Sequence, residues 1–170
     1  VDVYNHQPSI NMRSAERIEK QQYSTPAPTA FIAGMFVGGI NPETVFEPSA
    51  GNGIMTVYFP TNKVSVNEID GIRLQSLSKQ GFAQVTEQDA LQPFNIAKKD
   101  GVIMNPPFGS SKEITEDGFK IAGLDEQMIV NALKTLSNKG RAAIIMGGHN
   151  SYDEKGRLKA DKNFFNYLYS

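Results

Sequence analysis

The sequence contains no cysteine, and only two of its 170 residues are histidines. The absence of cysteine excludes disulfides, thiolate metal sites and covalent catalysis through sulfur. The two histidines, His6 and His149, lie far apart in the chain. Two isolated histidines are more often structural or surface residues than ligands, so we predict that the protein binds no metal.

Long apolar runs and an excess of charge are also missing. No stretch approaches the ~20 apolar residues that a membrane helix needs, and none has the layout of a signal peptide, so we expect a cytoplasmic protein. The chain carries 17 basic and 18 acidic residues, a formal net charge of −1. Because phosphate neutralisation dominates nucleic-acid affinity, this balance argues against strong DNA binding by the chain alone, although it is compatible with a DNA substrate.

The sequence does contain an alternation of short apolar strands with helices. Strands are predicted over 44–47, 63–69, 83–86, 102–104 and 142–146, and helices over 9–22, 29–37, 71–80, 124–136 and 161–169. We expect helix 29–37 to be mostly buried, and the polar segment 109–123 to be a mobile loop over the substrate cleft. This alternation favours an α/β fold with a mostly parallel sheet, which binds ligands at the carboxyl ends of its strands.

A glycine-containing loop, Glu47-Pro48-Ser49-Ala50-Gly51-Asn52-Gly53, follows the first predicted strand. Glu68 ends the second strand 21 residues later, where an acid can accept hydrogen bonds from two ribose hydroxyls, and Asp89 after the third can accept one from an adenine amine. The loop lacks the third glycine of a dinucleotide site and the Gly-Lys-Ser/Thr of a phosphate loop. Glu47 disfavours phosphates, so a cationic nucleoside such as S-adenosylmethionine fits best.

The segment Asn105-Pro106-Pro107-Phe108 ends the fourth predicted strand, in the same row of strand ends. An exocyclic amine is a poor nucleophile because its lone pair is delocalised into the ring. The Asn105 side-chain oxygen and the Pro106 carbonyl can accept its two N–H bonds and localise that pair, while Phe108 stacks on the base. Methyl transfer then depends on positioning and oriented dipoles, and a base in a duplex must first be flipped out.

In the motifs of these two sites, the chain resembles the N6-adenine-specific DNA methyltransferases, over roughly residues 18–148. Residues 105–108 look like the family's catalytic tetrad, 47–53 like its cofactor loop, 67–70 like its ribose-binding strand end and 88–91 like its adenine-binding segment. Residues 23–26 look like the N-terminal motif that contacts the methionine end of the cofactor. The resemblance thus implies these cofactor-binding residues: Tyr23, Ser24, Thr25, Pro26, Glu47, Pro48, Ser49, Ala50, Gly51, Asn52, Gly53, Glu68, Ile69, Asp89, Ala90 and Asn105.

The resemblance implies a Rossmann-like methyltransferase fold with helices on both faces of the sheet, formed by residues 1–170 as a single catalytic domain. In this family a further helix, a strand hairpin and a target-recognition region follow the fifth strand. Residues 161–169 can supply only the helix. We therefore expect a fragment, or half of a split enzyme, that lacks its last strands and contacts DNA through regions outside this sequence, with further domains or subunits as possible partners.

Several alternatives remain open. Cytosine C5 methylation is excluded because it needs a cysteine nucleophile, whereas cytosine N4 methylation is possible, and Asn105 rather than serine favours adenine. A second interpretation is methylation of RNA amines or of a glutamine amide in a protein. A third is a non-catalytic, cofactor-binding module of a larger restriction–modification or mobile-element protein.

Overall fold

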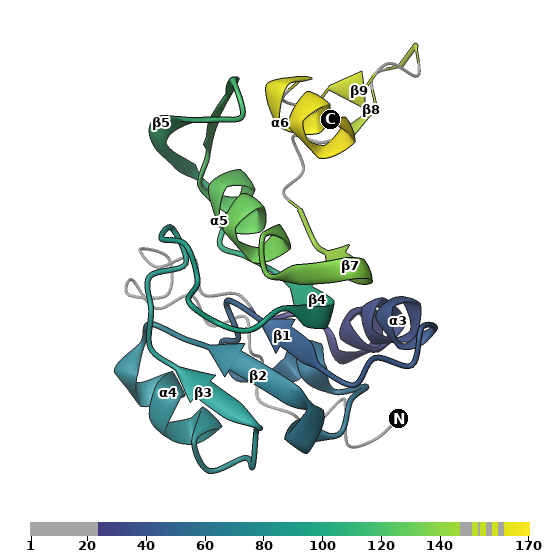
Figure 1. Ribbon diagram of the computed structural model, residues 1–170, viewed down its shortest axis with the longest axis vertical. Coiled ribbons are helices and arrows are strands. Elements are labelled where there is room, and N and C mark those ends of the chain that lie inside the picture. Colours follow the sequence, from purple (N-terminus) through teal and green to yellow (C-terminus); the bar gives the residue numbers. More distant parts are fainter. Residues whose placement is uncertain (1–23, 147–150, 153, 156–157, 160–161) are drawn as a thin grey trace.

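The computed structural model describes residues 24–146, 151–152, 154–155, 158–159 and 162–170 (Figure 1). Its elements, in chain order, are α3 (Ala27–Gly38), β1 (Val45–Glu47), the 3-10 turns η1 (Ile54–Thr56) and η2 (Thr61–Lys63), β2 (Val64–Asn67), α4 (Gly71–Leu77), β3 (Gln84–Thr86), β4 (Lys99–Met104), β5 (Ser110–Glu116), β6 (Phe119–Gly123), α5 (Leu124–Leu133), β7 (Leu136–Ile144), β8 (Ser151–Tyr152), β9 (Leu158–Lys159) and α6 (Lys162–Tyr169).

Five of the strands form one sheet in the order β3-β2-β1-β4-β7, and all four pairings are parallel. The chain builds outward from β1 through β2 to β3, then returns to the other side of β1 for β4 and β7. The direction of building therefore reverses between β1 and β4, which is where open α/β sheets bind their ligands. The predicted α/β fold with a mostly parallel sheet is confirmed.

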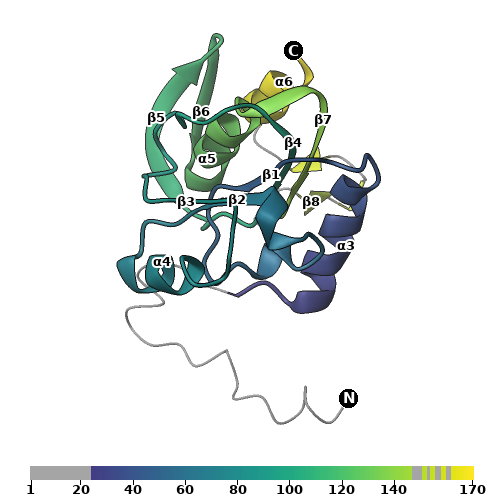
Figure 2. The same ribbon diagram turned by 60° about the horizontal axis from the view of Figure 1, so that its bottom comes forward.

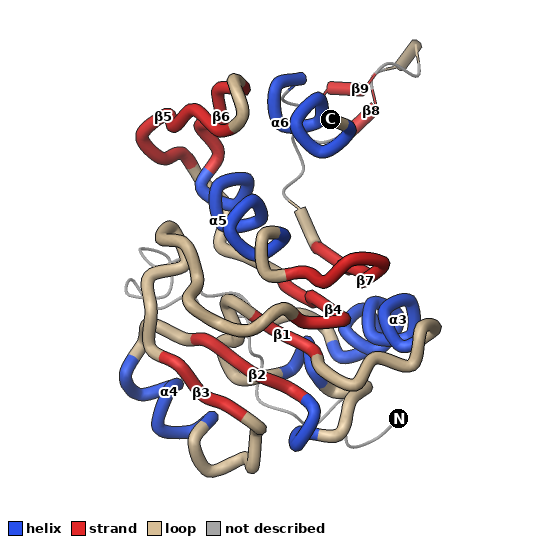
Figure 3. The backbone as a smooth tube through the Cα atoms, viewed as in Figure 1, coloured by secondary structure: helices blue, strands red, loops and turns tan. Residues whose placement is uncertain are grey.

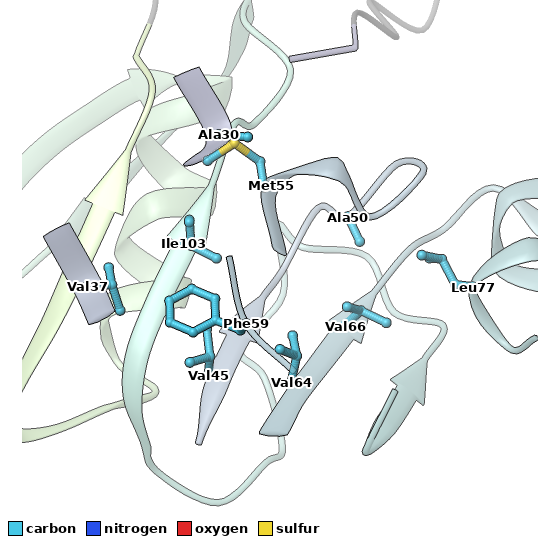
Figure 4. Packing of buried hydrophobic residues seen from close by; sticks show 10 residues of the cluster. All are labelled: Ala30, Val37, Val45, Ala50, Met55, Phe59, Val64, Val66, Leu77 and Ile103. Atoms are coloured by element: carbon cyan, nitrogen blue, oxygen red, sulfur yellow. The ribbon is translucent and has the colours of Figure 1, made fainter. Parts of the chain in front are cut away.

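Apolar side chains cover both faces of this sheet. Strand β4 shows why, because alternate side chains of a strand point to opposite faces: Ile103 joins one buried cluster, and Val102 and Met104 join the other. The first cluster lies between the sheet and α3, η1 and α4 (Figure 4). The second lies under α5, β6 and α6, on the opposite side of the sheet (Figure 2). The predicted helices on both faces are thus present.

Helix α3 differs from its prediction. We expected its large apolar residues to be buried, but Phe31, Ile32, Met35 and Phe36 are each about half exposed or more, with Ile32 at 66%. The helix instead packs on the sheet and on η1 through small residues, Ala30, Gly34 and Val37. A Cβ atom at Gly34 would overlap the Tyr58 side chain, so the close approach of η1 selects glycine here.

The segment after residue 108 also differs from its prediction. The expected mobile loop over 109–123 is an antiparallel hairpin of β5 and β6, whose polar, exposed residues gave no apolar strand pattern (Figure 3). The hairpin is anchored to α5 by Gln127, which is 4% exposed and whose Nε2 donates to the carbonyls of Lys112 at 2.8 Å and Ile121 at 3.1 Å.

Helix α5 ends at Leu133 rather than at the predicted residue 136. The Thr135 hydroxyl donates to the Ala132 carbonyl at 2.7 Å, and the Thr135 carbonyl accepts the backbone N–H of Lys99 at 2.8 Å. These bonds turn the chain into β7 alongside β4. Lys139 and Gly140 lie inside β7, where Lys139 has a positive φ of 68°.

The remaining predicted elements appear with shorter bounds: the first three strands, helix 71–80 as α4 and helix 161–169 as α6. The short connection between β1 and β2 contains η1 and η2 rather than a crossover α-helix. The predicted helix 9–22 lies outside the described residues. Within the part of the chain that the structure describes, no helix has the length and apolar character needed to span a bilayer.

Candidate functional site

A cavity of about 570 Å³ opens at the carboxyl ends of β1, β2 and β4. It lies where the order of the strands reverses, as the topology of the sheet predicts. The residues that line it come from segments far apart in the sequence: Ser24, Thr25, Glu47, Pro48, Ser49, Ala50, Gly51, Asn52, Ile54, Met55, Asn67, Glu68, Ile69, Asp70, Arg73, Asp89, Ala90, Asn105, Pro106, Pro107, Phe108, Leu124 and Met128.

The loop after β1 is held by the carboxylate of Glu68. Its Oε2 accepts the backbone N–H of Gly51 at 2.7 Å, and its Oε1 accepts that of Asp70 at 2.8 Å. Gly51 and Gly53 have φ values of 58° and 83°, in the left-handed region that favours glycine. Each carboxylate oxygen has a second lone pair, so Glu68 can still accept hydrogen bonds from a ligand in the cavity.

Asn67 lies in the segment 67–70 that resembles a ribose-binding strand end, but the sequence analysis did not predict its role in joining the strand ends. It is 1% exposed, and its Nδ2 donates to the Pro48 carbonyl at 3.0 Å and the Gln88 carbonyl at 2.9 Å. Its Oδ1 accepts the Thr86 hydroxyl at 2.9 Å. One buried amide therefore joins the loop after β1 to the ends of β2 and β3. The available signal was a polar residue at the end of an otherwise apolar strand.

Glu47 ends β1 with its carboxyl group almost completely enclosed, at 1% exposure. Burial and, to a lesser extent, the neighbouring Glu68 carboxylate raise the pKa of Glu47 well above its usual range. Its Oε2 has no hydrogen-bond partner among the described residues. A cation or a donor in the cavity can satisfy this oxygen, whereas a phosphate cannot.

Asn105 follows β4 and is one of the residues that line the cavity. Its Nδ2 donates to the Thr25 hydroxyl oxygen at 2.9 Å. Its Oδ1 is buried and, like Ser49 Oγ, has no hydrogen-bond partner within the described segments. The N-cap of α3 is Pro26, and no side chain of a described residue caps the helix.

Most of the predicted site residues line this one cavity. Pro26 and Gly53 do not. Pro26 is the N-cap of α3 and Gly53 the N-cap of η1. A Cβ atom added at Gly53 would contact Leu77 and Phe82. Tyr23 lies outside the described residues. The cavity residues that lie outside every predicted motif are Ile54, Met55, Arg73, Leu124 and Met128. Most of them lie on helices or turns, and neither strand ends nor motif spacing indicates which helical residues reach a cavity.

The chemistry of the cavity fits a cationic nucleoside. Its buried, unsatisfied polar atoms are a carboxyl oxygen of Glu47, an amide oxygen of Asn105 and a hydroxyl of Ser49, which can all accept hydrogen bonds. No cluster of three or more potential metal ligands occurs among the described residues. The site can therefore hold a ligand rich in donors or positive charge, with a second group next to Asn105 and Phe108.

Comparisons with known proteins agree with this geometry. A family model described as the Methyltransferase small domain matches residues 50–167. A protein from Listeria monocytogenes described as a class I S-adenosylmethionine-dependent methyltransferase has a similar structure, with a TM-score of 0.58 at 14% identity over 82% of this chain and 48% of that one. No curated protein sequence gives a significant match.

Two further solved structures share the fold. A protein from Pyrococcus horikoshii described as an RNA methyltransferase has a TM-score of 0.54 at 21% identity, over 79% of this chain and 66% of that one. A sugar N-methyltransferase from a Streptoalloteichus species has a TM-score of 0.51 at 11% identity, over 78% and 53%. This chain therefore spans between about half and two thirds of the length of these three proteins.

Proposed function

We propose that this chain, which belongs to the Methyltransferase small domain family, transfers a methyl group from S-adenosylmethionine to the N6 amine of an adenine flipped out of DNA. Residues 50–167, more than half of the chain, match that family. The observation that carries the proposal is the Asn105 amide, which belongs to a residue that lines the cavity. Its nitrogen is held by Thr25, while its buried oxygen has no partner in the described residues.

Different cavity residues would bind different parts of the cofactor. Glu68 would accept hydrogen bonds from the ribose hydroxyls and Asp89 one from the adenine amine of the cofactor, while Glu47 supplies a carboxyl group for its positively charged end. When bound, S-adenosylmethionine supplies an electrophilic methyl group on a sulfonium sulfur. Glu47 is 1% exposed, so water would screen its contact with a positively charged group only weakly.

The Asn105 tetrad prepares the amine of the substrate. Asn105 Oδ1 would accept one N–H of the amine and the Pro106 carbonyl the other, which would localise the lone pair of the nitrogen for in-line displacement. The C–S bond of the sulfonium would break as the N–C bond forms, and the methylated nitrogen would lose its extra proton to water. Phe108 holds the base by stacking, an interaction worth about 1–3 kcal/mol per base. No covalent intermediate on the protein is needed, in agreement with the absence of cysteine.

The amino-acid sequence of residues 47–53, together with asparagine rather than serine at position 105, favours adenine in DNA over the other amines as the substrate. The RNA methyltransferase from Pyrococcus horikoshii shares the fold at 21% identity, and that likeness carries no information on substrate. RNA and protein glutamine are therefore tested beside DNA.

The test is a substrate panel with methyl-labelled S-adenosylmethionine and single-stranded DNA, duplex DNA, RNA and protein. We expect label on the N6 of adenine in DNA, and a loss of about 10²–10³-fold in kcat for Asn105→Ala, the usual cost of removing one oriented group at a reacting centre. Glu68→Ala should lose cofactor binding by calorimetry. Glu43→Gln, at a surface ion pair with 80% exposure, is the matched control. Label on RNA or protein alone, or an unchanged rate for Asn105→Ala, would contradict the proposal.

A further inference from the structure

Thr25 makes a contact that its position in the sequence does not suggest. It is 7% exposed, it lies just before α3 and it is 80 residues from Asn105, yet its hydroxyl oxygen accepts a hydrogen bond from Asn105 Nδ2 at 2.9 Å. Both residues line the cavity. The bond therefore links the cofactor side of the site, formed by the N-terminal segment, to the end of β4 that meets the substrate.

The orientation of the Asn105 amide decides whether it can help the reaction. With Oδ1 toward the substrate it accepts an N–H from an amine, whereas the flipped amide would present its own N–H groups to those of the amine. A hydroxyl group can both donate and accept, so the Thr25 hydroxyl alone tolerates either orientation. Once its hydrogen is donated to another group, however, its oxygen can only accept, and only Asn105 Nδ2 can then face it.

We propose that Thr25 is a positioning residue that holds the Asn105 amide with Oδ1 toward the substrate, and that it does so most strongly when its own hydroxyl hydrogen is donated to an acceptor of the bound cofactor. This inference rests on the proposed function and deepens it. The structure has the pairing that this role requires: Nδ2 donates to Thr25, and Oδ1 is left without a partner among the residues described.

A consequence is that cofactor and amine acceptor are coupled. A ligand that accepts the Thr25 hydrogen favours the reactive orientation of Asn105, and by thermodynamic reciprocity the reactive orientation favours that ligand. Thr25→Val removes the hydroxyl with little change of shape, while Thr25→Ser keeps it. Thr25→Ala serves as a second hydroxyl-free variant in case the valine methyl does not fit.

The first experiment follows the Asn105 side-chain NH₂ signals by ¹⁵N NMR of the chain, with and without S-adenosylmethionine. The signals are identified by their loss in Asn105→Ala. We expect two well-separated hydrogens that exchange slowly with water, more slowly still with the cofactor, and an exchange about tenfold faster in Thr25→Val, from the loss of one hydrogen bond. Thr25→Ser should behave like the parent. Signals in Thr25→Val and Thr25→Ala that match those of the parent would overturn the proposal.

The second experiment is kinetic and uses a double-mutant cycle of Thr25→Val with Asn105→Ala. A positioning residue that acts through Asn105 should lower kcat about tenfold in the parent and have little further effect once Asn105 is truncated. Effects that multiply instead would overturn the positioning role. A chain that methylates none of the substrates contradicts the proposed function, while the NMR result still decides the role of Thr25.

Discussion

The buried surroundings of Glu47 disfavour the charged form of its carboxyl group. Its burial between β1 and the covering turns, together with the nearby Glu68 carboxylate, raises its pKa. Without a cation in the cavity the protonated form is favoured. A positively charged ligand reverses this preference, because its attraction to the carboxylate offsets the cost of desolvation.

The raised pKa of Glu47 predicts a pH dependence of stability. Because the folded-state pKa lies above the unfolded value of about 4.3, the native chain binds the proton more tightly. The stabilisation is fully present below the unfolded pKa and is lost as pH rises through the folded pKa. In the absence of cofactor, we expect the Tm of Glu47→Gln to exceed that of the parent by an amount that grows with pH, measured by circular dichroism. Glu43→Gln should follow the parent, and parallel curves for Glu47→Gln would show that its pKa is not raised.

At the scale of residues, the sequence predicted the members of the site that stand at strand ends. Glu47, Glu68, Asp89 and Asn105 could be brought together on paper because the carboxyl ends of parallel strands share one edge of a sheet. The hydrogen bond between Thr25 and Asn105 could not be predicted, since it joins segments 80 residues apart through the packing of α3. Asn67 could have been found as a lone amide in a buried strand.

Among the elements, the β5–β6 hairpin depends on one buried amide. Gln127 satisfies two hairpin carbonyls, those of Lys112 and Ile121, from inside α5. The contact replaces hydrogen bonds that the irregular register between Ser110 and Ile114 leaves out of the ladder. Gln127 therefore ties the hairpin to α5.

Replacing Gln127 with leucine should loosen this hairpin. The change keeps the volume but leaves two carbonyls without their donor, at a cost of about 1–3 kcal/mol in the free energy of unfolding. Hydrogen exchange should become faster across residues 110–123 and remain unchanged in β1 and β2. Glu113→Gln, which removes an exposed ion pair with Lys120, is the control and should change stability by less than about 0.5 kcal/mol. Equal exchange in Gln127→Leu and the parent would show that the amide does not anchor the hairpin.

Helices α3 and α4 each offer one glycine for a matched pair of substitutions. At Gly34 a methyl group would collide with Tyr58, and the cost of overpacking, about 1–3 kcal/mol, exceeds the gain in helix propensity. At Gly71, the first residue of α4, a Cβ meets nothing within 4 Å. Urea unfolding should thus show Gly34→Ala destabilised and Gly71→Ala unchanged or more stable by up to about 1 kcal/mol. A stabilised Gly34→Ala would mean that α3 is not held against η1.

Whether an element could be predicted depended on where its apolar residues lie in the fold. Strands β1 and β2 and the second half of β4 were found because they are short, mostly apolar and buried on both faces. The burial of α3 was mispredicted because its large apolar residues point outward while its glycines and alanine face the fold. The hairpin was missed because its strands are exposed and polar, and its order comes from contacts with α5 that are remote in sequence.

For the whole molecule, the balance of charge sets what the chain can do with DNA. With 17 basic and 18 acidic residues, few phosphates can be neutralised. We expect weak binding of a non-cognate duplex, with a dissociation constant above about 10⁻⁴ M at physiological salt and a log–log salt slope smaller in magnitude than about 3, measured by fluorescence anisotropy. Tight binding with a slope near that of proteins making 6–10 phosphate contacts would show a basic face that the net charge conceals.

The two ends of the β5–β6 hairpin meet at the cavity. The backbone N–H of Leu124 donates to the carbonyl of Gly109 at 2.9 Å, and Ser110 is opposite Gly123 in the ladder. Phe108 and Leu124, both lining residues, thus stand on either side of a closed base. Insertions or exchanges beyond that base leave the cavity walls in register, since a longer loop adds little closure entropy. The hairpin can therefore be exchanged, by evolution or by design, to alter the rim of the cavity without changing the residues at the strand ends.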